Sequence, residues 1–216
     1  MSIAQNISKI KAELAPFNTK LIAVTKMRSL DLLAELYDTG HKIFGENKVQ
    51  ELVPKYEALQ KDIEWHLIGH LQTNKVKYIA PFVHTIHSVD SLKLLEEINK
   101  QAAKNQRVIN CLLQMYIAKE ETKFGLDEAE ALGILNEIQA FENIKIIGLM
   151  GMATNSIDVE VVRNEFRSLR AFFDKIKSIS SHNIEITELS MGMSGDYLVA
   201  AQEGSTMVRI GSAVFS

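Results

Sequence analysis

The chain is poor in cysteine and proline, and it has no long apolar run. Its 216 residues include one cysteine and three prolines. The single cysteine, Cys111, excludes an internal disulfide framework, fits a reducing compartment, and is expected to be an inert core residue. The N-terminal residues do not have the basic and apolar regions of a secretory signal peptide, and no apolar run is long enough to cross a bilayer. We therefore expect a cytoplasmic protein with no membrane partner.

Excess positive charge and linker-like composition are absent as well. The formal net charge is −3, so the chain lacks the excess of positive charge that nucleic-acid binding favours, and no nucleic-acid partner is expected. No Gly-, Ser- or Pro-rich stretch and no block of charge divides the chain. Hydrophobic residues make up 46%, enough for a full core. The composition predicts one domain over residues 1–216.

What is present is a repeated alternation of short apolar runs and amphipathic segments. The first fifteen residues predict an extra N-terminal helix, because their Ile and Leu residues recur at helical spacing. Further helices are expected over 29–40, where Ser29 is the N-cap candidate, over 88–105, starting at Ser88 or Asp90, and over 127–141 and 159–179. The eight apolar runs, which we predict to be strands, are 21–24, 42–44, 65–68, 84–87, 108–117, 144–150, 184–189 and 207–210.

Alternating strands and helices indicate parallel strands, because a parallel crossover needs a connection of helix length. Eight such units predict the α/β class and a single (β/α)8 TIM barrel with an extra N-terminal helix. A doubly wound open sheet is the alternative, although no GxGxxG motif follows the first strand. In both folds ligands bind beyond the carboxyl ends of the strands, and Lys26 follows the first strand.

Residues after the predicted strands are expected to surround one mouth, including the segment 118–125. The loops at 190–196, "SMGMSGD", and 209–213, "RIGSA", follow the seventh and eighth strands, where barrels often bind phosphate. Small residues leave backbone amides available to an anion. Each loop alone could be an ordinary uncharged turn, but their shared position favours a phosphate site.

Lys26 beside a phosphate site predicts a Schiff base to a phosphorylated aldehyde or ketone. This chemistry needs a neutral amine, whereas an ordinary lysine has a pKa near 10.4. We expect partial burial, together with the cation of Arg209, to lower the pKa of Lys26. The alternative is a solvated loop lysine.

Several longer motifs, in order along nearly the whole chain, resemble one known family. The motifs are "IAVTK", "FGENKVQEL", "WHLIGHLQTNK", "ETKFGL", "GLMGMAT", "LSMGMSGD" and "GSTMVRIGSAVF". They resemble the YggS/PROSC family of pyridoxal phosphate homeostasis proteins. The resemblance implies a barrel like the N-terminal domain of alanine racemase, with pyridoxal 5'-phosphate held by Lys26 as a Schiff base. One departure is "VTKMRS", where the family often has "VSKTKP".

The resemblance also implies the roles of further residues. Arg209 would face the pyridine nitrogen, to which a guanidinium can only donate; the alternative is a surface ion pair. Asn47 would form a wall of the pocket or serve turn geometry. Met191 is expected to contact the cofactor and to fill space in the mouth. The residues expected to hold the phosphate are Ser190, Ser194, Gly211 and Ser212.

No metal is expected. His66 and His70 lie on either side of "LIG", and His84 and His87 are three residues apart, spacings that do not share one face of a strand. No carboxylate or cysteine partner is evident beside them.

Three functions from different classes remain open at this point. The first is a carrier that binds pyridoxal 5'-phosphate without turnover, with apo enzymes that depend on this cofactor as possible acceptors; we expect it to be a monomer. The second is an amino-acid racemase, which needs a second base, and only Tyr116 and Tyr197 among the tyrosines could approach the mouth. The third is a Schiff-base aldolase. The first is favoured, so no catalytic residue is assigned.

Overall fold

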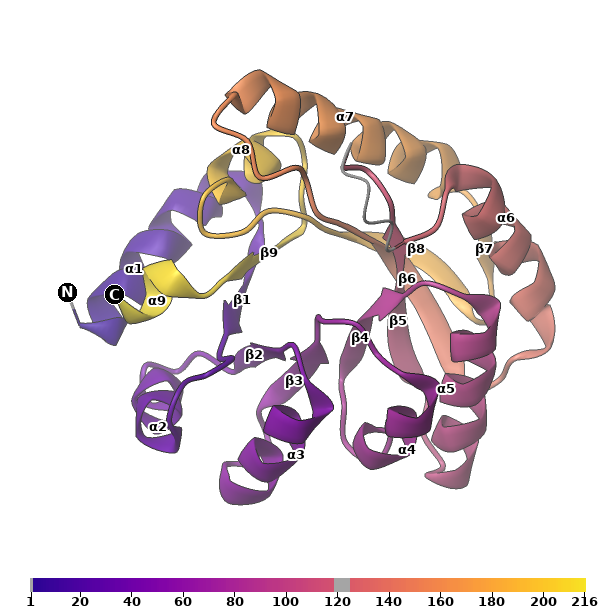
Figure 1. Cartoon of the computed structure of the whole chain (residues 1–216), viewed down its shortest axis with the longest axis horizontal. Coiled ribbons are helices and arrows are strands. Elements are labelled where there is room, and N and C mark those ends of the chain that lie inside the picture. Colours follow the sequence, from indigo (N-terminus) through magenta and orange to yellow (C-terminus); the bar gives the residue numbers. More distant parts are fainter. Residues whose placement is uncertain (1, 119–124) are drawn as a thin grey trace.

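The computed structural model describes residues 2–118 and 125–216, which form a barrel of parallel strands surrounded by helices (Figure 1). The barrel strands are β1 Lys20–Val24, β2 Ile43–Glu46, β3 Glu64–Leu67, β4 Thr85–Val89, β5 Ile109–Met115, β6 Ile144–Gly151, β8 Ile184–Ser190 and β9 Met207–Ile210. Each predicted strand is present, with shifts of one or two residues at some ends.

Strand pairing closes the barrel and excludes the open sheet. Neighbouring strands pair in chain order from β1 to β6, β6 then pairs with β8, β8 with β9, and β9 with β1. The closing ladder places Ile22 opposite Arg209. The two-residue strand β7, Ser180–Ser181, pairs antiparallel with β8 outside this circle. The prediction of a (β/α)8 barrel is confirmed.

Helices cover the outside of the barrel and bury their apolar faces on it (Figure 1). Among the described residues, none of them combines the length and apolar composition that a membrane span requires. The 3-10 turns are η1 Ala15–Phe17, η2 Thr73–Lys75 and η3 Ile138–Ala140. The α-helices are α1 Ile3–Leu14, α2 Leu30–Asp38, α3 Val49–Ala58, α4 Val76–Ile79, α5 Leu92–Lys104, α6 Glu128–Glu137, α7 Val159–Ile176, α8 Tyr197–Gln202 and α9 Ser212–Phe215.

The extra N-terminal helix α1 packs against the C-terminal segment of the chain. Ser2 and Gln5 form a capping box at its start, so the first turn has few unpaired amides. Its apolar face is buried, and the side-chain amide of Asn6 donates to the carbonyl oxygens of Val214 and Ser216 at 3.1 and 2.8 Å. In Figure 1, α1 lies beside α9. These contacts fix the position of the C-terminal segment next to the end of β9.

Helix starts were partly predictable. Ser29 caps α2, as expected, because its hydroxyl accepts from the amide of Leu32. The predicted start of helix α5 at Ser88 or Asp90 is wrong. Strand β4 continues to Val89, and the N-cap of α5 is Ser91. Ser88 is a buried strand residue, so its side chain is not available to cap a helix.

Candidate functional site

A cavity of about 800 Å³ opens at the carboxyl ends of the barrel strands, and we call it the mouth cavity. Ligand sites of barrels of this kind lie at this end. Its lining includes residues that follow β1, β2, β3, β6, β8 and β9, so residues far apart in sequence meet there. The sequence-predicted residues that line it are Lys26, Asn47, Ser194, Arg209, Gly211 and Ser212.

Lys26 extends from a tight turn after β1. Thr25 is still buried, and its amide continues the sheet ladder by donating to Gly45 at 2.9 Å. The chain then turns, with Met27 in the left-handed region at φ 58° and the amide of Arg28 donating back to Thr25. Lys26 itself is exposed. The prediction that it is partly buried is therefore wrong, because the turn carries it past the last buried strand residue into an open cavity.

A buried ion pair lies next to this turn. The Lys55 ammonium donates to Glu46 Oε1 at 2.6 Å and to the carbonyl oxygen of Thr25 at 2.8 Å. The Thr25 hydroxyl donates to the same Glu46 oxygen. Burial raises the pKa of Glu46, while the hydrogen bonds from Lys55 and Thr25 oppose that shift. The sequence pattern did not identify this pair, because Lys55 falls in an amphipathic helix where lysines are normally solvated.

Arg209 lies inside the barrel wall, not on the surface. It is 4% exposed, and its Nη1 donates to the carbonyl oxygen and the hydroxyl of Ser190 at 2.8 and 2.7 Å. Its Nη2 donates to the carbonyl oxygen of Gly151 at 3.0 Å. Burial lowers the pKa of Arg209 to about 10, so the guanidinium remains charged at neutral pH. This burial excludes the alternative of a surface ion pair.

The loops after β8 and β9 meet at one side of the mouth cavity. The amide of Gly211 donates to the Ser194 hydroxyl at 3.3 Å, which joins the two loops. In the described part of the chain, the amides of Gly195 and Ser212 have no protein acceptor. Uncovered amides next to serine hydroxyls are suited to bind an oxyanion.

Two predicted ligand contacts, Ser190 and Met191, do not line the cavity. Ser190 is fully buried, and its hydroxyl contacts Arg209 and, at 3.0 Å, His87 Nδ1. Met191 is also fully buried, and its amide donates to Met207. Both lie at or directly after the end of β8, below the loop that reaches the mouth. In this geometry Ser190 positions Arg209, and Met191 fills the core.

Neither tyrosine considered as a second base lines the mouth cavity. Tyr197 donates to Glu13 at 2.5 Å on the side of α1, and burial with this hydrogen bond raises its pKa to about 12. Tyr116 directly follows β5 and is not part of the lining. His70 does line the cavity, and its Nδ1 lies 3.3 Å from Asp90. The sequence assigned no role to His70, although it follows β3 at the barrel mouth.

The expected contribution of the segment 118–125 stays a prediction, because residues 119–124 lie outside the described part of the chain. Directly after this segment the chain meets the barrel, because the amide of Leu126 donates to the carbonyl oxygen of Gln114 at 2.8 Å.

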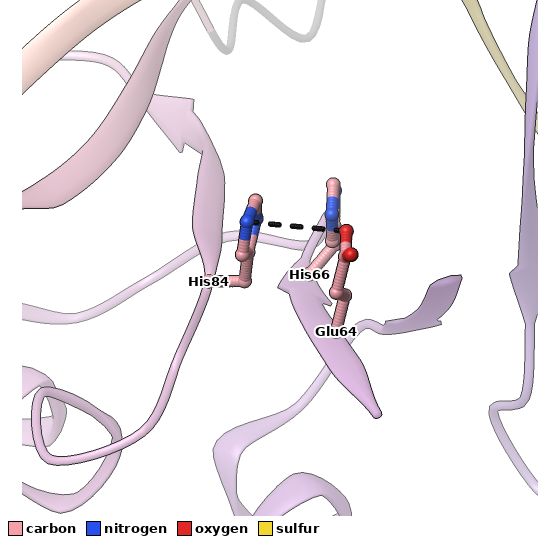
Figure 2. A group of neighbouring side chains, drawn as sticks. All are labelled: Glu64, His66 and His84. Atoms are coloured by element: carbon pink, nitrogen blue, oxygen red, sulfur yellow. Dashed lines mark ion pairs between the residues drawn. The ribbon is translucent and has the colours of Figure 1, made fainter. Parts of the chain in front are cut away.

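The histidines are not isolated, and the expectation that no carboxylate lies beside them is wrong. Glu64 lies beside His66 and His84, as Figure 2 shows. Glu64 begins β3 and His84 directly precedes β4, so this group lies at the amino ends of the strands, opposite the mouth cavity. Glu64 and His66 are two residues apart on β3, so their side chains share a face. His66 is 2% exposed, and burial lowers its pKa to about 3.

Comparisons with known proteins agree with this architecture. The alanine racemase N-terminal domain family matches residues 1–216. A pyridoxal phosphate homeostasis protein of Aquifex aeolicus (strain VF5) is 42% identical over 197 residues, covering 91% of this chain and 86% of the relative. The protein of the same name from Homo sapiens is 33% identical over 224 residues, 99% of this chain and 82% of the relative. The chain therefore belongs to the alanine racemase N-terminal domain family.

Solved structures of relatives show the same fold. PipY of Synechococcus elongatus PCC7942, solved with PLP bound, has a TM-score of 0.90 at 33% identity, and each chain is covered completely. Alanine racemase from Bartonella henselae is 18% identical with a TM-score of 0.74, covering 98% of this chain and 57% of that one. The second likeness concerns the fold alone.

Proposed function

We propose that this protein binds pyridoxal 5'-phosphate covalently through Lys26 and acts in vitamin B6 homeostasis as a carrier without turnover. Residues 1–216 would be one cofactor-binding barrel domain, working as a monomer. The observation that carries the proposal is the lining of the mouth cavity. The exposed Lys26 shares this lining with the buried Arg209 and with the serine hydroxyls and backbone amides of the two loops after β8 and β9. The relatives named for this function, and PipY with its cofactor, support it.

The donor set fits the cofactor. Ser194, Ser212 and the uncovered amide of Gly195 supply neutral hydrogen bonds for the phosphate. Arg209 can only donate a hydrogen bond, so it favours an unprotonated pyridine nitrogen, and Asn47 forms part of the wall. The bound cofactor supplies an aldehyde that is reactive toward amines, and an unprotonated ring is a weak electron sink.

Exposure of Lys26 suits transfer to an acceptor more than catalysis. Carbanion chemistry favours a site from which water is excluded, whereas the mouth cavity leaves the lysine amine accessible. Apo enzymes that use the same cofactor are the proposed acceptors. Neither tyrosine considered as a second base lines the cavity, which argues against two-base racemisation.

The test is the identity of the labelled lysine. Untagged protein should absorb in the visible range after incubation with pyridoxal 5'-phosphate, and borohydride reduction followed by peptide mass mapping should locate the adduct on Lys26. Lys26→Ala should lose the adduct, while Lys48→Ala, a substitution of an exposed lysine outside the cavity, should keep it. A dominant adduct on another lysine would reject the assignment.

One observation favours a second function, amino-acid racemisation. His70 lines the mouth cavity with its Nδ1 3.3 Å from Asp90, which places an imidazole, a common general base, beside the proposed cofactor site. The assay is exchange of the alanine Cα proton for deuterium in D2O. Exchange at enzymatic rates that His70→Ala abolishes supports racemisation; absence of exchange from loaded protein supports the carrier. The aldolase alternative requires trapping of a dihydroxyacetone phosphate adduct on cofactor-free protein.

A further inference from the structure

A second cavity, of about 200 Å³, opens at the amino ends of the barrel strands, and we call it the floor cavity. Its lining includes Lys20 at the start of β1, Glu64 at the start of β3 and His84 directly before β4. It therefore lies at the opposite end of the barrel from the mouth cavity, and the proposed function does not use it.

Three potential metal ligands converge in the floor cavity. Glu64 and His66 point to the same side of β3, and His84 is placed beside them because its amide donates to the carbonyl oxygen of Trp65 at 2.9 Å. One donor atom from each lies within 4.8 Å of the other two. His84 Nε2 is 3.9 Å from Glu64 Oε2, the contact drawn as a dashed line in Figure 2.

One ring nitrogen of His66 has no hydrogen-bond partner in the part of the chain that the structure describes. The Nδ1 of His66 lies 2.8 Å from His87 Nε2, and His87 in turn contacts Ser190. These contacts fix the orientation of the His66 ring. Its Nε2 is buried and has no hydrogen-bond partner among the described residues. A buried polar atom without a partner is costly, and metal-binding histidines are commonly oriented through their second nitrogen in this way.

We infer that the floor cavity binds one divalent transition-metal ion, with His66, His84 and Glu64 as its protein ligands. Two imidazoles and one carboxylate are a ligand set that suits zinc, with water as the fourth ligand. Magnesium and calcium favour sites built from oxygen alone. The cavity has room for the ion and its water.

Binding requires a small rearrangement that the exposed ligands permit. Zinc–nitrogen bonds of about 2.0–2.1 Å require ligand atoms roughly 3.3 Å apart. His84 Nε2 and Glu64 Oε2 are farther apart than that, at 3.9 Å. The rings of His66 and His84 are stacked at 5.3 Å, so His84 must turn for its nitrogen to face the ion. The side chains of His84 and Glu64 are 45% and 48% exposed, so they can move toward the fixed His66.

The charges around the cavity are compatible with a cation. Lys20 is the basic side chain in the lining, and its ammonium is already paired with Glu188 at 2.5 Å. Glu64 contacts only His84 among its described ion-pair partners, so its negative charge is available to the metal. A bound dication would thus have the Glu64 carboxylate as a ligand and the Glu188 carboxylate, paired with Lys20, in the same cavity lining.

The test is zinc binding by untagged protein that has been stripped with EDTA. Titration with ZnCl2 in competition with a chromophoric chelator should give one site per chain. His84→Ala and Glu64→Gln should each weaken zinc affinity at least tenfold. His182→Ala is the matched control, because it removes an exposed histidine outside the cavity, and its affinity should equal that of wild type.

Two further readouts separate ligation from misfolding. Co²⁺ in place of zinc should give visible absorption of a site with nitrogen and oxygen ligands, and His84→Ala should lose it. Thermal midpoints in EDTA should agree among wild type, His84→Ala and Glu64→Gln, because both positions are exposed. The inference is overturned when wild type lacks a stoichiometric site, when both variants bind zinc like wild type, or when His182→Ala loses the site.

Discussion

Lys55 and Glu46 form a buried ion pair with an N–O distance of 2.6 Å next to the turn that carries Lys26. The same ammonium donates to the carbonyl oxygen of Thr25, the residue before Lys26. A charge on α3 therefore fixes the peptide from which the proposed cofactor lysine extends. Exposure of Lys26 and rigidity of its backbone thus coexist at this site.

Loss of one partner of this pair should be strongly destabilising. Lys55→Met leaves the Glu46 carboxylate buried without its cation, which we expect to lower the free energy of unfolding by about 3–5 kcal/mol. Urea unfolding followed by circular dichroism measures this change. The double variant Lys55→Met with Glu46→Leu should recover a large part of the loss, because neither charge then remains buried. Equal losses in the single and double variants would contradict this account.

Replacement of Arg209 should weaken cofactor binding without removing the attachment point. Arg209→Lys keeps a positive charge but cannot hold Ser190 and Gly151 together as the guanidinium does. We expect at least a tenfold weaker affinity for pyridoxal 5'-phosphate, measured by absorption titration. Ser190→Ala, which leaves the Arg209 bond to the carbonyl oxygen of Ser190 in place, should have a smaller effect. A reversed order would show that Ser190 acts directly on the ligand.

The two phosphate loops should distinguish the cofactor from its dephosphorylated form. Ser194→Ala and Ser212→Ala each remove a hydroxyl from the mouth cavity. Each should weaken binding of pyridoxal 5'-phosphate about tenfold or more, since a hydrogen bond to a charged group contributes about 1.5–3 kcal/mol. Binding of pyridoxal, which has no phosphate, should hardly change. If both ligands lose affinity equally, these loops do not hold the phosphate.

Buried His41 should make the protein sensitive to mild acid. Burial lowers its pKa from 6.5 to about 4, with a smaller contribution from Lys11. The folded state therefore keeps this imidazole neutral while the unfolded state binds a proton, so stability falls as the pH drops through that window. The expected slope is about 1.4 kcal/mol per pH unit for this residue.

The measurement is urea unfolding at several pH values between 7 and about 4 for wild type and His41→Gln. Carboxylates and the other buried histidines contribute to both proteins, so the difference between the two curves isolates His41. Glutamine can still donate to the carbonyl oxygen of Ile43, the group that His41 Nε2 contacts at 3.0 Å. Parallel curves would mean that His41 takes up its proton in the folded state as readily as in the unfolded one.

Several features were predictable because they depend on local pattern. Apolar runs flanked by amphipathic segments located each barrel strand, and the end of the first run placed Lys26 at the carboxyl edge of the sheet. Small residues in the loops after β8 and β9 indicated where an anion could bind, and Ser194 and Gly211 do meet there. Ser29 was recognised as a cap, since capping acts over three residues.

Other features depend on which side chains face each other across the barrel, and no local pattern contains that information. Lys55 resembles a surface lysine of an amphipathic helix until α3 packs it against Glu46 and Thr25. Ser190 belongs to a sequence motif that we predicted to hold phosphate, yet its place at the end of β8 directs its hydroxyl to Arg209. Glu64 and His84 are twenty residues apart and meet only because β3 and β4 are neighbours. Hydrophobic periodicity reports which residues are buried, whereas strand order and register decide their partners.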